Sequence, residues 1–208
     1  MIRKNINTES LTAKMIGALF LGAIFAYGIG NSLLSDAVTS RGGGMLVGIG
    51  ALLMACNSLF VITIGVLFYP ILKRSSEVIA NGYLSARIIE ATLLIIGVIW
   101  LLLGADANIS SQLAIKGNFY AYQFAMLVLA AGSIPFTLTL FKTKMIPPFL
   151  AMWGIVGYSS LLLGVVLEFV GVKTGLTFVI AGGLFEMLLA LWLILKGFTL
   201  PRQEIQVQ

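Results

Sequence analysis

The sequence predicts an all-α polytopic membrane protein, a transmembrane bundle of about six helices with both termini in the cytoplasm. The chain of 208 residues is 59% hydrophobic and only 10% charged, whereas soluble domains average about 25% charged residues. Its mean hydropathy is +1.04. Apolar runs of roughly 20 residues recur along the chain, and each is long enough to cross a hydrocarbon core about 30 Å thick.

The apolar runs indicate helices rather than the strands of a β-barrel. They are continuous and rich in Leu, Ile, Val, Ala and Gly, whereas barrel strands alternate apolar and polar residues. A backbone in lipid must satisfy its own hydrogen bonds, which a helix does within one segment. We expect spans at residues 15–34, 45–70, 84–104, 119–141, 148–170 and 175–196. No segment between them is long enough to fold alone, so residues 1–208 are expected to form a single integral membrane domain.

Basic residues precede the first apolar run, an arrangement that also occurs in secretory signal peptides. The apolar region of a signal peptide is only about 7–15 residues long. The run here is longer, and no motif of small residues ends it as a cleavage site would. We therefore expect it to remain in the protein as the first helix.

Lysine and arginine residues near the span ends predict the orientation, because cytoplasmic loops are enriched in them. With the N-terminus inside, nine of these residues are cytoplasmic and three are external. The cytoplasmic residues are Arg3, Lys4, Lys14, Lys73, Arg74, Lys142, Lys144, Lys196 and Arg202, and the external ones are Arg41, Lys116 and Lys173.

Composition argues against several classes of function. The net charge is +5, but the basic residues are scattered beside apolar runs, so we do not expect nucleic acid as a partner. The chain has no histidine and a single cysteine, Cys56. A disulfide within the chain is therefore excluded, and the usual ligands of zinc and of b-type haem are missing. We expect no metal and no cofactor, and the bilayer is the expected environment.

Charged residues inside the apolar spans are the main candidate site. In the stretch SARIIEATLLIIGVIW, residues 85–100, Arg87 and Glu90 stand one helical turn apart. Glu90 lies about six residues, roughly 9 Å, inside the third span. Glu186 lies about ten residues, roughly 15 Å, from the end of the last span. These depths allow Arg87, Glu90 and Glu186 to meet as an intramembrane cluster, with Asn57 of the second span as a further polar member.

The cost of burying these charges predicts that they pair. An isolated charge near the bilayer centre costs about 2.5–3.5 kcal/mol on insertion scales. One arginine cannot neutralise two carboxylates, so a proton, water or a cation must complete the cluster. The first interpretation is a salt bridge that holds the third span against the sixth. A transport or proton-relay pathway, and a pocket for a ligand or lipid headgroup, are the alternatives.

Small residues recur on single helix faces, where they allow helix backbones to approach closely. This pattern indicates tight packing within the bundle, and the same faces would also fit a second copy or another membrane protein. The residues concerned are Ala18, Gly22, Ala26 and Gly30 in the first span, Gly44 and Gly48 in the second, and Gly157, Gly164 and Gly171 in the fifth.

Four segments resemble a bacterial family of membrane proteins identified as domain of unknown function 4386. They are TAKMIGALFL, NSLFVITIGVLFYPILK, ARIIEATLL and GGLFEMLLALWLILKG. The likeness covers most of the chain and includes Arg87, Glu90, Glu186 and Trp192. It implies a multi-pass protein of about six helices in the bacterial cytoplasmic membrane. It implies no activity, since none is established for the family.

Two classes of function fit these observations. The first is a structural, accessory or partner-binding membrane protein that is not an enzyme and contains no catalytic residues. The second is a small carrier, channel, or proton-coupled transporter or sensor that uses the same charged cluster.

Reporter fusions test the predicted topology. Fusions at Lys73, at Lys142 and at the C-terminus should all report a cytoplasmic position, because the distribution of basic residues favours it. A periplasmic signal at any one of these positions would contradict the predicted threading and the depths derived from it.

Overall fold

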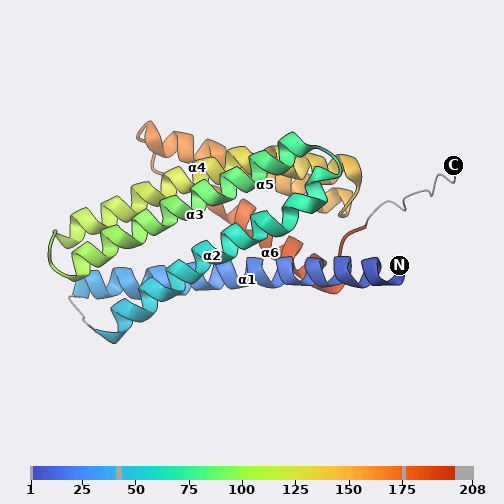
Figure 1. The fold of residues 1–208 in the computed structure, drawn as a ribbon. Helices are drawn as coiled ribbons and strands as arrows, with labels where there is room; N and C mark the ends of the chain where they lie inside the picture. The colour runs from blue at the N-terminus through green and yellow to red at the C-terminus, as the bar shows by residue number, and fades with distance from the viewer. Residues whose placement is uncertain (1, 41–43, 175–176, 200–208) are drawn as a thin grey trace.

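The computed structural model describes residues 2–40, 44–174 and 177–199, of which residues 2–9 are described by their backbone alone. Every regular element in these ranges is an α-helix, and the helices form one elongated bundle (Figure 1). The helices are α1 (Ile2–Ser40), α2 (Met45–Lys73), α3 (Glu77–Ala105), α4 (Ser111–Thr143), α5 (Pro148–Phe169) and α6 (Thr177–Leu195).

All six helices are long and apolar enough to cross a membrane. The predicted fold class is thereby confirmed, and the chain is a multi-pass membrane protein. Several helices continue beyond the predicted spans. The helix containing the third span begins seven residues earlier, at Glu77, where the hydroxyl of Ser76 accepts a hydrogen bond from the Ile79 amide at 3.3 Å. Hydropathy marks only the part that lies in hydrocarbon, whereas a capped helix continues into the polar interface.

The helices pack in a closed ring that follows the order of the chain. Each helix from α1 to α5 contacts the next one, and α6 contacts α1 to close the ring. Helix α1 also reaches α3 and α4 across the centre. In a ring of six, α3 and α6 stand on opposite sides, so a bond between them crosses the middle of the bundle.

The two ends of the bundle differ in which connections they carry. We call the end with the start of α1 and the end of α6 the terminal end (Figure 1). Basic residues gather there, namely Lys14, Lys73, Arg74, Lys142, Lys144 and Lys196, while Lys116 and Lys173 lie at the opposite end. The side chains of Arg3, Lys4, Arg41 and Arg202, and the first two residues of the predicted sixth span, lie outside the described residues. Which end faces the cytoplasm stays a prediction.

Glycines bring neighbouring helices into close contact. A Cβ atom at Gly30 would lie 2.9 Å from the backbone oxygen of Gly50, and one at Gly157 would lie 3.0 Å from that of Ala181. Among the small residues noted in the sequence, these two therefore pack within the bundle. Gly48 differs, because a Cβ atom there would meet nothing within 4 Å.

An aromatic cluster fills the centre of the ring towards the terminal end. Phe68 packs edge-on against Phe20, Tyr83 and Phe136, with ring centroids 6.4, 5.7 and 4.8 Å away. Tyr83 also stacks on Phe136 at 4.2 Å. All four side chains are at most 1% exposed. We call these four residues the terminal aromatic cluster.

Closure of the ring depends on Gly17, where α1 meets α6. A Cβ atom at Gly17 would lie 2.5 Å from the backbone oxygen of Ala190. We expect Gly17→Ala to lower the free energy of unfolding by about 1–3 kcal/mol, the usual cost of overpacking. The matched control is Gly48→Ala, which should cause no loss. Detergent unfolding of both variants measures the difference, and equal stability of the two would contradict the described contact between α1 and α6.

Candidate functional site

Arg87 and Glu90 form a buried ion pair on α3. Their spacing of three residues places the side chains on one helix face. The Arg87 Nη1 atom donates a hydrogen bond to the Glu90 Oε2 atom at 2.8 Å. The two residues are only 2% and 3% exposed, so water does not screen the pair as it would at a surface.

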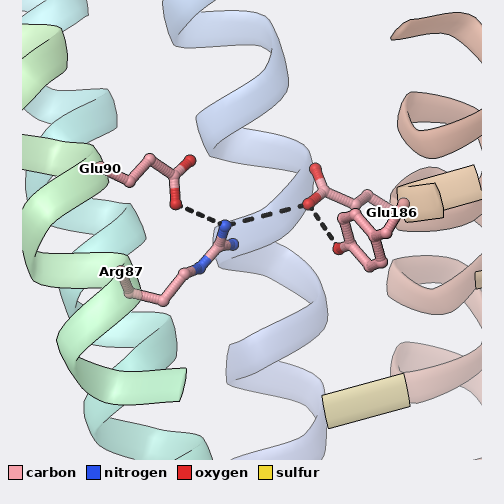
Figure 2. Close-up of polar contacts among 4 residues, drawn as sticks. Arg87, Glu90 and Glu186 are labelled. Carbon is pink, nitrogen blue, oxygen red and sulfur yellow. Dashed lines mark hydrogen bonds and ion pairs between the residues drawn. The ribbon is translucent and has the colours of Figure 1, made fainter. Parts of the chain in front are cut away.

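Glu186 approaches the same guanidinium from the opposite side of the ring. Its Oε1 atom lies 3.9 Å from Arg87 Nη1, and Figure 2 shows the guanidinium between the two carboxyl groups. The hydroxyl of Tyr158, on α5, donates a hydrogen bond to the same Glu186 oxygen at 2.8 Å. The central cluster, as we call Arg87, Glu90, Glu186 and Tyr158, therefore joins α3, α5 and α6.

Aromatic rings surround the guanidinium where carboxylates do not. The Arg87 Cζ atom lies 5.4 Å from the ring centroid of Phe20 and 5.6 Å from that of Tyr83. These distances are typical of cation–π contacts. The terminal aromatic cluster thus forms one wall of the arginine site.

The central cluster contains one more carboxyl group than it has cations. Arg87 uses a single nitrogen, Nη1, to face both Glu90 and Glu186. Its Nε atom is buried and has no hydrogen-bond partner among the described residues. If both carboxyl groups are ionised, the formal charge of the cluster is −1. A proton or a further cation is needed to neutralise it.

A cavity of about 220 Å³ adjoins the central cluster, and all six helices line it. Arg87, Glu90 and Glu186 form its polar side. Towards the opposite end of the bundle, the rings of Tyr27 and Tyr122 stack with centroids 5.5 Å apart and also line it. We call this space the central cavity.

The structure brings together the three charged residues that the sequence singled out. Asn57, the further polar residue, lies in the wall of the central cavity and is 3% exposed. Its Nδ2 atom has no hydrogen-bond partner among the described residues. Asn57 therefore faces the same space as the cluster without a described bond to it.

Sequence reasoning missed the aromatic members of the site, above all Tyr158. The signal that could have revealed Tyr158 was a hydroxyl in the middle of an apolar span, next to Gly157. Glu186 lies at the midpoint of α6, with nine helical residues on either side, and Glu90 lies near the middle of α3 because that helix begins at Glu77.

A family model described as Domain of unknown function (DUF4386) matches residues 15–197. The chain belongs to this family. The matched region contains Arg87, Glu90, Tyr158 and Glu186, so the whole central cluster lies inside the family domain. No curated protein and no solved structure matches the chain.

A double-mutant cycle tests the bond between Tyr158 and Glu186. Hydrogen bonds to charged groups contribute about 1.5–3 kcal/mol. We expect Tyr158→Phe to lower the free energy of unfolding by about that amount, and by less when Glu186→Gln is already present. Titration with a denaturing detergent measures all four species. Tyr122→Phe is the matched control, since among the described residues the hydrogen bonds of the cluster join Arg87 to Glu90 and Tyr158 to Glu186 and do not include the Tyr122 hydroxyl. Strict additivity would contradict the coupling.

Proposed function

We propose that this protein is a non-enzymatic accessory protein of the bacterial cytoplasmic membrane that binds a small ligand in its central cavity. The observation that carries this proposal is the position of the central cluster, which lines a cavity of about 220 Å³ to which all six helices contribute residues. In this proposal the cluster holds the helices together around the cavity and forms its polar wall.

The geometry supports a structural role for Arg87. Its guanidinium links carboxylates on helices that face each other across the ring. Removing one partner from a buried ion pair leaves an uncompensated charge, which is more costly than the pair itself. Arg87 therefore acts as a clasp between α3 and α6.

One feature supports binding rather than conduction. The terminal aromatic cluster stands between the central cavity and the terminal end of the bundle, and its side chains are almost completely buried. A hydrophilic path to that end would have to pass these rings.

The second candidate function, a proton-coupled carrier, is favoured by the missing positive charge of the central cluster, because a proton would supply it.

The residues around the cavity favour binding over catalysis. The chain has no histidine, the usual base for a serine or cysteine nucleophile. Its single cysteine, Cys56, is exposed and does not line the cavity. The cavity walls instead offer ionic, amide and aromatic groups of the kind that orient a bound molecule.

Substitutions in the central cluster separate a clasp from a proton pathway. Arg87→Ala should lower the free energy of unfolding by about 3–5 kcal/mol, because the buried carboxyl group of Glu90 and the partly buried one of Glu186 lose their cation. The triple variant Arg87→Met, Glu90→Gln, Glu186→Gln should recover much of this loss, since no buried charge remains unpaired. Thermal unfolding in detergent measures both variants.

Proton flux in liposomes is measured beside stability. The proposed function predicts no flux in the wild type and recovered stability in the triple variant. Flux in the wild type that Glu186→Gln abolishes without loss of stability would contradict the proposal and support the carrier. Lys73→Ala is a matched control, because its ion pair with Glu77 at 2.7 Å is exposed and should contribute little.

A further inference from the structure

We propose that the central cavity binds a small lipophilic organic cation, which enters from the membrane through a gap between α1 and α6. This inference rests on the proposed function, since it names the chemical class of the ligand that the cavity would hold. Three properties of the cavity support it: the charge of its wall, its aromatic lining and its opening.

The charge of the cavity wall calls for one additional cation. Two carboxyl groups, Glu90 and Glu186, share the single guanidinium of Arg87. The contact between Arg87 and Glu90 is a hydrogen bond of 2.8 Å, whereas the distance to Glu186 is 3.9 Å. Glu186 is thus the less neutralised of the two carboxylates. A cation beside Glu186 would balance the site without displacing Arg87.

The remaining walls suit an organic cation. The rings of Phe20, Tyr27, Tyr122 and Tyr158 all line the cavity. Aromatic faces attract substituted ammonium groups, and this attraction is strongest where water is excluded. Asn57 adds a buried amide whose Nδ2 atom is unpartnered among the described residues, so a polar substituent of the ligand would find a hydrogen-bonding group there.

The size of the cavity limits the ligand to a small molecule. Its volume is about 220 Å³, somewhat larger than the ~150 Å³ of an engineered cavity that binds benzene. A single ring with a short ammonium substituent fits that space. Within the described residues, no group of three or more His, Cys, Asp or Glu side chains could hold a metal ion, so the favoured ligand is an organic cation.

Two glycines that line the cavity support an opening between α1 and α6. The two helices run antiparallel and are in close contact near Gly17 and Ala190. Counting away from this contact, Gly28 lies eleven residues along α1 and Gly183 seven residues back along α6, so their levels differ by four residues, roughly 6 Å. Both glycines line the cavity, and a Cβ atom on either would meet nothing within 4 Å. Gly28 is also exposed, and this open space between α1 and α6 is the route that the proposal assigns to the ligand.

The ligand class is tested with a charged probe and its neutral isostere. Benzyltrimethylammonium and neopentylbenzene have nearly the same shape and differ in charge. Equilibrium dialysis against protein in lipid nanodiscs, with empty nanodiscs as the blank, measures binding of each. We expect the cation to bind about tenfold more tightly or better, since cation–π and ionic attraction act in a desolvated site.

Two variants with different cluster charges make the test specific. The double variant Arg87→Met, Glu90→Gln removes one charge of each sign and keeps Glu186, so it should still prefer the cation. Adding Glu186→Gln removes the last charge, and the preference should fall to what the aromatic walls alone supply. The double variant leaves Glu186, which is 15% exposed and keeps its hydrogen bond from Tyr158, and the triple variant leaves no charge. Both are expected to fold, which thermal unfolding checks. A preference in the triple variant as large as in the wild type would overturn the assignment to Glu186.

The remaining outcomes distinguish this inference from the proposed function. Equal binding of the cation and its isostere by the wild type would overturn the cation site but leave the cavity as a binding site. Binding of neither compound would overturn both. For the route, Gly28→Leu and Gly183→Leu should slow association of the cation several-fold, whereas Gly48→Leu on α2 should not. Unchanged association rates in both Gly28→Leu and Gly183→Leu would contradict access between α1 and α6.

Discussion

The position of one guanidinium between two carboxyl groups, in the middle of a lipid-embedded ring of helices, is the constraint on which the rest of the structure depends. A charge in this environment is tolerated only when protein groups replace the water that it has lost. Arg87 meets this requirement with Glu90 on its own helix, Glu186 across the ring, and two aromatic rings. Helices on opposite sides of the bundle are thereby held at a fixed separation.

That separation explains why the bundle encloses a cavity. Apolar helices in lipid gain little from the hydrophobic effect when they associate, so close packing depends on small residues at the contacts. Such contacts occur between neighbours in the ring, as at Gly30 with Gly50 and at Gly157 with Ala181. Across the centre, long side chains replace them. Where those side chains end, beside Glu186, the space between the helices remains open.

The sequence was sufficient to predict the parts of this arrangement that depend on composition and on the free-energy cost of burying a charge. Hydropathy located six spans. The free-energy cost of an unpaired charge in the membrane predicted that Arg87, Glu90 and Glu186 meet. The order of the helices around the ring could not be predicted, because the apolar faces of different helices have similar sequence patterns. Tyr158 was missed for a related reason: a tyrosine in an apolar span fits lipid, protein or interface equally well, and only its place opposite Glu186 gives it a role.

The two proposed roles of the central cluster, a clasp between helices and a binding site for a cation, favour different charges in the same residues. A second cation in the central cluster would complete its charge balance and strengthen the clasp, but it would remove the attraction for a cationic ligand. Complete replacement by apolar side chains would often be equally stable, and it too would remove that attraction. The observed composition, with two carboxyl groups, one guanidinium and a tyrosine hydroxyl, lies between these extremes. The shortfall of one positive charge is therefore better explained by the proposed cationic ligand than by the stability of the fold.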